Sequence, residues 1–334
     1  MKIRLLIATC DSDYSEHLSD VLSKDFSDAI EVSVCSTNER LHTLLEAQSF
    51  DAALLDSSML TACDLKSILL PMLLWAKEDE AIDIPSGVKS IRKYQRISSL
   101  AGTILENYAL ISSENNTVDP DRAFVTAVWS PAGGVGKTTV ALAYAARRVS
   151  EGKQVLYLDL ESFSSVPAFF TESGTSISTV FDMLENRSGN LKVLLKGILR
   201  LDSAAGIGYF CRPNNYDDIN ILSSDDISTL ITACSGVTEE LVIDLPSVCD
   251  DRAQRIFEMA DSILLITDPS PTAKAKLSQF VTQHNIFERI RSKTKFVANK
   301  GASLSAQPVD CNLSLPLLHA ADAPAVYRTL AAGM

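Results

Sequence analysis

Ten consecutive residues, 130–139, combine the residue types that bind phosphate. They read Ser-Pro-Ala-Gly-Gly-Val-Gly-Lys-Thr-Thr and follow an apolar, β-like run at 124–129. The glycines let the backbone curl until its N–H groups point inward at phosphate oxygens. Lys137 can place its ammonium on the β- and γ-phosphates, and the Thr138 hydroxyl can ligate Mg²⁺. The pattern therefore predicts a phosphate-binding loop whose binding residues are Gly133, Gly134, Val135, Gly136, Lys137, Thr138 and Thr139.

The residues on either side of this loop separate a phosphate site from an incidental glycine-rich turn. The run 139–150 is rich in Ala and ends before Gly152, which predicts a helix. The positive end of a helix dipole at that point would favour an anion. A strand before the loop and a helix after it favour nucleotide binding, although Pro131 stands where the general pattern has glycine.

Acidic residues stand at the ends of two further apolar runs. Asp159 ends the run 154–159, and Glu161 lies two residues later, so both carboxylates can point to one site. Asp244 ends the run 240–244 and is expected to hold the hydration shell of Mg²⁺. Acids often end strands without any function. The phosphate loop is what makes Asp159, Glu161 and Asp244 candidates for catalysis and metal binding.

Asn299 follows a fourth apolar run, at 295–298. Its side-chain amide could pair with a purine base, although Asn also serves in ordinary turns. All of these polar residues follow predicted strands. Open α/β sheets bind ligands at the carboxyl ends of their strands, so the four segments are expected to form one nucleotide site.

Composition and charge narrow the class of protein. The chain has 334 residues and a formal net charge of −12, so we expect two domains and no general affinity for nucleic acid or anionic membranes. Its seven cysteines form no C-x-x-C pair, which is typical of reduced thiols in a cytoplasmic protein. The longest apolar stretch, 68–76, contains Pro71 and is too short to span a membrane. The basic run 289–295 is interpreted as a solvated helix end, with nucleic-acid contact as the alternative.

A polar segment at 113–121, with Asn-Asn and Asp-Pro, is the best linker candidate. It separates an expected first domain, 1–112, from an expected second domain, 122–334. The first domain repeats β-like and helical patterns, which predicts a small doubly wound parallel sheet. Its expected strands are 3–9, 30–35, 51–55 and 72–75, and its expected helices are one beginning at Asp11 or Ser12, one at 41–48 and one at 97–108.

The second domain repeats this logic with longer connections. Its expected strands are apolar throughout, as is typical of strands covered on both faces. They are 124–129, 154–159, 240–244, 262–267 and 295–298. The predicted fold class is therefore α/β with two doubly wound sheets, a smaller one followed by a larger one.

The second domain resembles the ParA/MinD family of deviant P-loop ATPases. The matching motifs are Ala132-Gly133-Gly134-Val135-Gly136-Lys137-Thr138-Thr139, Asp159-Leu160-Glu161, Ile243-Asp244-Leu245-Pro246, Asn299 and Leu315-Pro316-Leu317. The resemblance implies ATP and Mg²⁺ as ligands, Asn299 and Pro316 at the adenine, and a homodimer that sandwiches the nucleotides. It also implies catalytic roles for Lys137, Asp159 and Glu161.

Two departures from this family pattern bear on activity. The family places a second lysine where this chain has Ala132, and that lysine reaches the partner's phosphates. The family's water-positioning Asp is Glu161 here. Loss of a cationic phosphate contact weakens charge neutralisation, so we expect ATP binding with weak hydrolysis. The C-terminal segment 320–334 holds one basic residue, Arg328, and lacks a basic amphipathic membrane helix, so direct membrane insertion is not expected.

The first domain resembles a response-regulator receiver. Asp56 ends the run 51–56 and matches the phosphoacceptor, and Lys93 matches the late lysine of that family. The acidic pair that holds Mg²⁺ aligns near Thr9 and Cys10, which leaves only Asp11. Without a metal cage, transfer of a phosphoryl group to Asp56 lacks charge neutralisation. A docking or dimerisation domain with an inactive Asp56 is the favoured interpretation.

This combination of domains resembles the TadZ/CpaE family, which positions Flp (Tad) pilus assembly machinery. The resemblance implies a localisation ATPase with protein partners in a pilus or secretion assembly. It would be cytoplasmic, at the cell pole or held peripherally by those partners, with no specific nucleic acid. The alternatives are a ParA-type DNA-partitioning ATPase and a phospho-regulated signalling protein.

Overall fold

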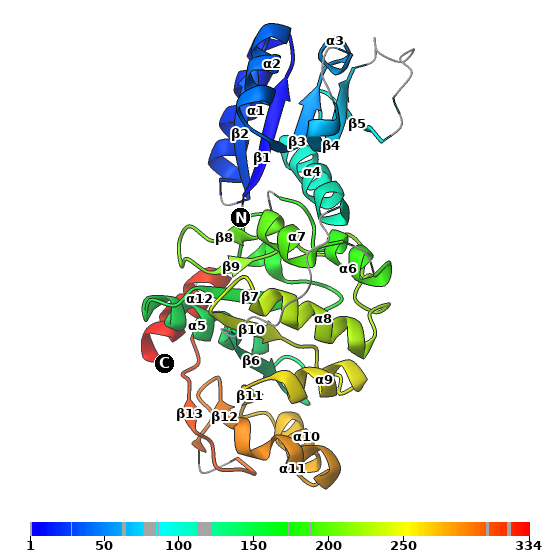
Figure 1. The fold of residues 1–334 in the computed structure, drawn as a ribbon. Coiled ribbons are helices and arrows are strands. Elements are labelled where there is room, and N and C mark those ends of the chain that lie inside the picture. The colour runs from blue at the N-terminus through cyan, green and yellow to red at the C-terminus, as the bar shows by residue number, and fades with distance from the viewer. Residues whose placement is uncertain are drawn as a thin grey trace. The chain divides into compact units, whose positions relative to one another are not determined.

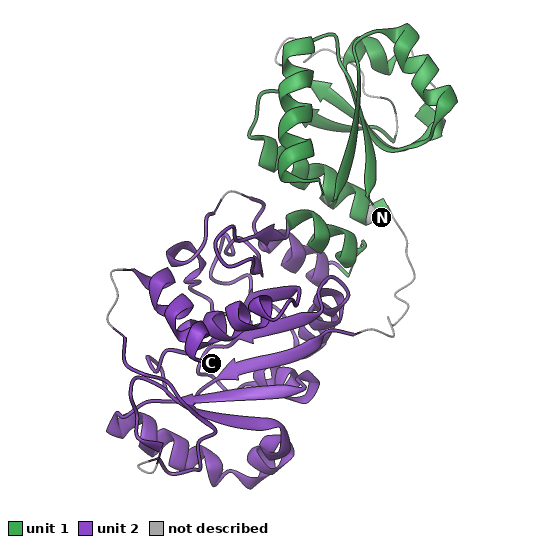
Figure 2. Ribbon diagram, turned by 90° about the vertical axis from the view of Figure 1, so that its left-hand side faces the viewer, with its two compact units in different colours: residues 1–116, 187–198 green, residues 117–186, 199–334 purple. Residues whose placement is uncertain are grey.

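The computed structural model describes the chain except residues 1, 28, 62–64, 77–84, 86, 112–121, 173, 188, 305–306 and 319–321. It divides into two compact units (Figure 2). Unit 1 comprises residues 1–116 and 187–198, and unit 2 comprises 117–186 and 199–334. The expected linker, 113–121, lies outside the described residues. The segment 187–198, which the sequence grouped with the second domain, belongs to unit 1.

Unit 1 contains a parallel sheet, as predicted, and this sheet has five strands rather than the four that were expected. Its order is β2-β1-β3-β4-β5, the flavodoxin-like doubly wound order. The strands are β1 (Ile3–Ala8), β2 (Ile30–Cys35), β3 (Phe50–Leu55), β4 (Ile68–Trp75) and β5 (Lys89–Arg92). All six residues of β3 are buried, because helices cover both faces of this sheet.

The helices of unit 1 follow the apolar periodicity of the sequence. They are α1 (Ser12–Asp25), α2 (Asn38–Ala47), the short α3 (Ser57–Leu60) and α4 (Ile97–Ile111), with a 3₁₀ turn η1 (Leu65–Ser67). Asp11 caps α1 by accepting a hydrogen bond from the Tyr14 N–H at 3.1 Å. Leu18 and Leu22 lie fully buried on its inner face, as their spacing predicts.

Unit 1 is completed by α7 (Leu191–Ile198), which lies in the segment 187–198. The chain on both sides of this segment belongs to unit 2. This helix packs on α4, and its Leu194 and Leu195 side chains are buried. A Cβ added to Gly197 would lie 2.3 Å from Leu105 Cδ1, so glycine permits the close approach of the two helices. The apolar face of α7 packs on α4, so α7 belongs to unit 1 although the chain before and after the segment 187–198 belongs to unit 2.

Unit 2 contains an eight-stranded sheet in the order β13-β12-β11-β6-β10-β7-β9-β8. Its strands are β6 (Phe124–Trp129), β7 (Val155–Asp159), β8 (Arg200–Leu201), β9 (Gly208–Tyr209), β10 (Glu240–Asp244), β11 (Ser262–Thr267), β12 (Thr294–Ala298) and β13 (Leu313–Ser314). Every pairing is parallel except that of β8 with β9. The α/β prediction with two parallel sheets is therefore confirmed.

Helices of unit 2 cover both faces of this sheet (Figure 1). They are α5 (Lys137–Ser150), α6 (Ser178–Glu185), α8 (Ser224–Ser235), α9 (Asp251–Met259), α10 (Pro271–Val281), α11 (His284–Ile290) and α12 (Ala323–Gly333), with 3₁₀ turns η3 (Val166–Ala168) and η4 (Arg291–Lys293). The chain crosses the sheet in one direction through α5 and returns through α8 and α9. Because such crossovers are right-handed, α5 lies on the opposite face from α8 and α9. Among the described residues, no helix has the length and apolar character needed to cross a membrane.

Candidate functional site

The segment 130–136, here called the phosphate loop, joins β6 to the first residue of α5, Lys137. Gly134 and Gly136 have φ angles of 73° and 91°, in the left-handed region that glycine adopts without a steric cost. A Cβ on Gly136 would lie only 2.5 Å from the Asn299 Nδ2 atom. The structure therefore places the predicted glycine-rich loop between a strand and a helix, the arrangement that suits phosphate binding.

Lys137 is the only cation that the sequence assigned to this loop, and it lies inside the site. Its side chain is 7% exposed, and its Nζ atom donates to the Ser247 Oγ atom at 3.2 Å. The Glu161 Oε1 atom lies 3.6 Å from Nζ, and the Glu161 side chain is 27% exposed. The structure thus brings Lys137 and Glu161 together, and it adds Ser247, which the sequence analysis missed.

Asp159 and Asp244 lie opposite each other on neighbouring strands β7 and β10. Asp159 accepts hydrogen bonds from Ser164 Oγ at 2.6 Å and from the Glu161 N–H at 2.8 Å. Burial, partly offset by the Ser164 bond, raises the pKa of Asp159 to about 6. Burial and then the Asp159 carboxylate raise the pKa of Asp244 to about 8. Positive charge at this edge of the sheet would therefore favour the ionised form of both groups.

The environment of Asp244 fits a Mg²⁺ site. Asp244 is 0% exposed, its Oδ2 atom accepts from the Tyr157 hydroxyl at 2.9 Å, and its Oδ1 atom has no hydrogen-bond partner among the described residues. The Thr138 hydroxyl is close enough to lower the Asp244 pKa. Magnesium prefers oxygen ligands and binds through one or two protein groups together with phosphates and waters. Thr138 and Asp244 are thus the residues of this chain that would hold it.

Asn299 lies against the phosphate loop. It is 4% exposed, and its Nδ2 atom donates to the Val135 carbonyl at 2.8 Å. The sequence analysis expected this amide to pair with a purine base. In the structure, its Nδ2 atom donates to a backbone carbonyl of the phosphate loop. Its neighbour Lys300 also reaches the loop, by donating to the Gly134 carbonyl. Lys300 was missed as a site residue, although its place directly after Asn299 was a usable signal.

Two other residues singled out in the sequence lie near these elements. Pro316 is exposed and follows Leu315, whose N–H donates to the Ala298 carbonyl at 2.8 Å, so Pro316 lies beside the end of β12. Ala132 is 4% exposed and belongs to the apolar cluster of unit 2. Its N–H donates to Ser130 Oγ at 3.1 Å. The methyl group of Ala132 therefore contributes to packing inside unit 2.

A second polar site occupies the carboxyl edge of the unit 1 sheet. The Asp56 Oδ1 atom lies 2.7 Å from Lys93 Nζ. Its Oδ2 atom accepts from the Thr9 hydroxyl at 2.6 Å and from the Cys10 N–H at 2.9 Å. Asp11 is engaged elsewhere, because its carboxylate caps α1 and accepts from the Tyr94 hydroxyl. Asp56 is thus paired entirely with groups of unit 1 itself.

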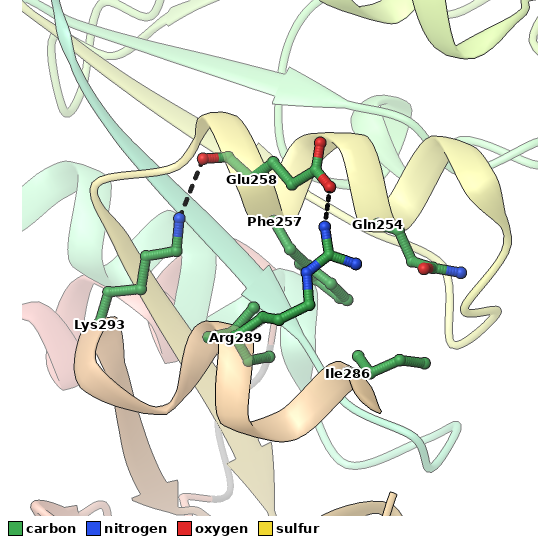
Figure 3. Close-up of a pocket in the computed structure, with 7 residues that line it drawn as sticks. Gln254, Phe257, Glu258, Ile286, Arg289 and Lys293 are labelled. Atoms are coloured by element: carbon green, nitrogen blue, oxygen red, sulfur yellow. Dashed lines mark hydrogen bonds and ion pairs between the residues drawn. The ribbon is translucent and has the colours of Figure 1, made fainter. Parts of the chain in front are cut away.

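The basic run 289–295 is engaged with neighbouring groups of unit 2. Arg289 forms an ion pair with Glu258, and Lys293 Nζ donates to the Glu258 carbonyl at 3.0 Å (Figure 3). Lys293 Nζ also donates to the Ala260 carbonyl at 2.8 Å. Burial lowers the Lys293 pKa. These side chains line a cavity of about 200 Å³ between α9, α11 and η4, to which the phosphate loop does not contribute. The run ends α11, forms η4 and supplies the first two residues of β12, in agreement with the interpretation of a helix end before a strand.

Comparisons with known proteins agree with the loop and the fold. No protein-family model matches the chain. The chain is similar to the septum site-determining protein MinD of Helicobacter pylori, with 24% identity over 213 residues, covering 59% of this chain and 76% of that protein. This similarity, taken with the strand, loop and helix at 124–150, supports a P-loop ATPase fold of ParA/MinD type.

Solved structures with a similar chain trace include a ParA family ATPase and a MinD protein. A ParA family ATPase from Chlorobium tepidum has a TM-score of 0.49 and 17% identity, covering 59% of this chain and 84% of that one. MinD from Pyrococcus horikoshii, complexed with Mg-ADP, has a TM-score of 0.47 and 15% identity, covering 59% of this chain and 82% of that one.

Proposed function

We propose that this chain is an ATP-binding ATPase of ParA/MinD type that hydrolyses slowly and positions an assembly of other proteins. The observation that carries the proposal is the arrangement at the carboxyl edge of the unit 2 sheet. There, a lysine held at 3.2 Å from Ser247 and 3.6 Å from Glu161 shares the site with a fully buried carboxylate that has an oxygen without a partner among the described residues.

Each residue of this site has a defined role in the proposal. The loop N–H groups and Lys137 bind the phosphates of ATP, while Thr138 and Asp244 hold Mg²⁺, which neutralises phosphate charge when bound. Lys137 must exchange Glu161 and Ser247 for phosphate oxygens. Glu161 is then free to orient a water molecule, with Asp159 fixing the backbone N–H of Glu161 at 2.8 Å.

Slow hydrolysis follows from the charges available at the site. Phosphoryl transfer depends on neutralising the charge that develops on the phosphate oxygens. Ala132 cannot supply the second lysine of the ParA/MinD pattern. Glu161 carries its carboxylate one methylene further from the backbone than Asp would. The chain is therefore suited to a long-lived ATP-bound state, which fits a scaffold or localisation role.

Unit 1 is proposed as the domain that docks partners or dimerises. Its Asp56 is paired with Lys93, Thr9 and the Cys10 N–H, which favours a fixed structure over a phosphorylation switch. The resemblance to TadZ/CpaE suggests that the partners belong to an Flp (Tad) pilus or secretion assembly, at a pole or another cell site. A homodimer formed in the ATP-bound state would present two copies of this domain to such an assembly.

Light scattering of the purified protein, with and without ATP and Mg²⁺, tests this proposal. We expect a shift from monomer to dimer mass with ATP, retained nucleotide, and no shift in Lys137→Ala. Lys153→Ala is the matched control, because Lys153 is a partly exposed lysine in a weak ion pair at 3.9 Å. Unchanged mass and no retained nucleotide in the wild type would overturn the proposal. ATP-dependent, salt-sensitive binding to DNA would instead favour the partitioning alternative.

A further inference from the structure

Two consecutive residues after β12 hold two consecutive carbonyls of the phosphate loop. The Asn299 Nδ2 atom donates to the Val135 carbonyl at 2.8 Å, and Lys300 Nζ donates to the Gly134 carbonyl. The sequence separation is more than 160 residues. Both contacts therefore join distant parts of unit 2 rather than stabilise a local turn.

The Lys300 side chain is held in place from several sides. Its backbone has a φ of 54°, in the left-handed region that a residue other than glycine adopts only when its surroundings impose it. Nζ also lies 3.1 Å from the Asp268 Oδ2 atom, and the Asp268 side chain is only 10% exposed. Although burial opposes it, hydrogen bonds from Ser270 and Lys300 keep the Asp268 pKa below its ordinary value.

A loop that points its N–H groups inward at phosphate must turn some carbonyls outward. Each such carbonyl needs a donor if it is not in water, and a charged donor gives the stronger bond. Asn299 and Lys300 supply these donors at Val135 and Gly134. Asn299 lies so close to the phosphate loop that a Cβ on Gly136 would be only 2.5 Å from its Nδ2 atom. The two side chains thus fix both the direction of the carbonyls and the path of the loop.

We infer that Asn299 and Lys300 form a clamp that positions the phosphate loop before a ligand arrives, and that they recognise its polyphosphate part indirectly through the loop. The inference rests on the proposed nucleotide site and deepens it. It assigns Asn299 a role besides base recognition, since one N–H of its amide already donates to the Val135 carbonyl. Asn299 and Lys300 are positioning residues, because neither needs to touch the ligand to act.

The clamp and a base-reading role predict different ligand dependences. A clamp that organises the loop strengthens the binding of any ligand with the right phosphates, whether or not a base is attached. A base reader strengthens only the binding of nucleotides. Inorganic tripolyphosphate with Mg²⁺ is therefore the informative probe, because it carries the phosphates of ATP and no base or sugar.

The test measures dissociation constants of ATP and tripolyphosphate, each with Mg²⁺, by titration calorimetry on the full chain. Lys300→Met keeps the aliphatic stem and removes the ammonium, and Lys300→Gly also relieves the positive φ. We expect both ligands to bind about tenfold more weakly to each variant, the scale of one charge-assisted hydrogen bond. Lys300→Arg should recover most of the affinity. Lys295→Met, at an exposed lysine of β12, should change neither constant.

Three results would overturn an assignment. Weaker ATP binding with unchanged tripolyphosphate binding in Lys300→Met and Asn299→Ala would replace the clamp by base recognition. Unchanged binding of both ligands in Lys300→Met and Lys300→Gly would remove Lys300 from the site. If the wild type binds neither ligand, the proposed nucleotide site itself fails, and this outcome differs from the other two because it appears without any substitution.

Discussion

At the carboxyl edges of both sheets, acidic residues lie near a lysine, but the two edges differ in how fully these charged groups are paired. In unit 1, the Asp56 Oδ1 atom makes an ion pair of 2.7 Å with Lys93 Nζ, although no hydrogen bond to it is formed among the described residues. The Asp56 Oδ2 atom accepts two hydrogen bonds, at 2.6 and 2.9 Å. In unit 2, Lys137 makes longer contacts, at 3.2 and 3.6 Å, and one oxygen of buried Asp244 has no partner among the described residues. The charged groups of the first edge pair with one another, whereas those of the second edge are the groups that we propose bind phosphate and a cation.

This difference shows why an acid and a lysine at strand ends are not sufficient evidence of a site. The free energy of burying a charged side chain is unfavourable unless an opposite charge or hydrogen bonds offset it. Where the partner is internal, as for Asp56 and Lys93, the charges stabilise the fold. Where no opposite charge is paired with a buried carboxylate, as for Asp244, the free-energy cost of burial remains, and binding of a cation would offset it. The two edges should therefore respond in opposite ways to substitution.

The largest effect is expected at the self-satisfied edge of unit 1. Asp56→Ala leaves the Lys93 ammonium buried without its partner and should lower the free energy of unfolding of unit 1 by roughly 3 kcal/mol. The chain has two tryptophans, Trp75 in unit 1 and Trp129 in unit 2. Urea unfolding monitored by fluorescence in a Trp129→Phe background therefore reports on unit 1 through Trp75.

A matched control for Asp56→Ala is Asp251→Ala, an exposed acid of α9 in unit 2, which should leave the unit 1 transition unchanged. Equal stability of the wild type and Asp56→Ala would show that the ion pair is not structural. Stoichiometric labelling of Asp56 by acetyl phosphate would likewise contradict a self-satisfied edge and would restore the phosphorylation alternative.

The second effect concerns the ligand that the unit 2 edge requires. ATP with Mg²⁺ at about 100 times its dissociation constant should stabilise wild-type unit 2 by about 2.7 kcal/mol. Lys137→Met should lose most of this stabilisation while keeping its stability without ligand, because the methionine stem still fills the space. Urea unfolding in a Trp75→Phe background reports on unit 2 through Trp129, and Lys153→Met is the control. An ATP-dependent gain that survives in Lys137→Met would contradict the assignment of Lys137 to the phosphates.

The third effect is a pH dependence caused by Asp244. Its pKa is raised from an ordinary value of 3.8 to about 8, so folded unit 2 binds a proton that the unfolded chain has released. The contribution of Asp244 to the stability of unit 2 without ligand should therefore be full below about pH 4 and be lost as pH rises through about pH 8. Asp244→Asn should make this profile less steep, leaving the smaller contribution of Asp159, whose pKa is raised to about 6. It should also raise stability at high pH by roughly 1–3 kcal/mol and abolish stabilisation by Mg²⁺ with ATP.

Urea unfolding of unit 2 across this pH range, for the wild type and Asp244→Asn, provides the measurement. Asp251→Asn is the control, because this acid is exposed and should leave the slope of the pH profile as in the wild type. A profile for Asp244→Asn as steep as that of the wild type would assign the titration to another group.

Much of the fold could be predicted because apolar runs of five or six residues carry a strong signal. The predicted strands 30–35, 124–129, 240–244 and 262–267 coincide with β2, β6, β10 and β11. Two-residue strands such as β8, β9 and β13 are too short for any periodicity. Helix α7 belongs to unit 1 because its apolar face packs on α4. Nothing in the local sequence of 191–198 specifies Leu105 of α4 as the contact.

The sequence was less informative about the chemistry of the two edges. It located Lys137, Asp159, Glu161 and Asp244, because motif spacing identifies them. It did not show that one oxygen of Asp244 has no hydrogen-bond partner among the described residues, or that Asn299 donates to the phosphate loop. Both facts depend on contacts between segments far apart in the sequence, 87 residues for Tyr157 and Asp244 and 164 for Val135 and Asn299. Whether a buried polar atom has a hydrogen-bond or ion-pair partner depends on how the chain packs, and this is the property in which the two edges differ.

The smallest expected effect compares two buried threonines, one in each unit. Thr9, at the carboxyl edge of unit 1, is 0% exposed and donates to Asp56 at 2.6 Å. Thr126, in β6 of unit 2, is 1% exposed, and its hydroxyl has no hydrogen-bond partner among the described residues. Thr9→Val should lower the stability of unit 1 by about 1 kcal/mol, whereas Thr126→Val should leave unit 2 unchanged or slightly more stable.

Both substitutions replace a hydroxyl by a methyl group of nearly the same shape, so packing changes little in either case. The two tryptophan backgrounds measure each unit separately by urea unfolding. Because Thr9 bonds to a carboxylate that is also held by Lys93, its loss should weaken a network, and Thr9→Val combined with Lys93→Met should cost less than the sum of the two single losses. A strictly additive double variant would mean that the three groups act independently, and the self-satisfied edge would then be a set of separate contacts rather than one unit of structure.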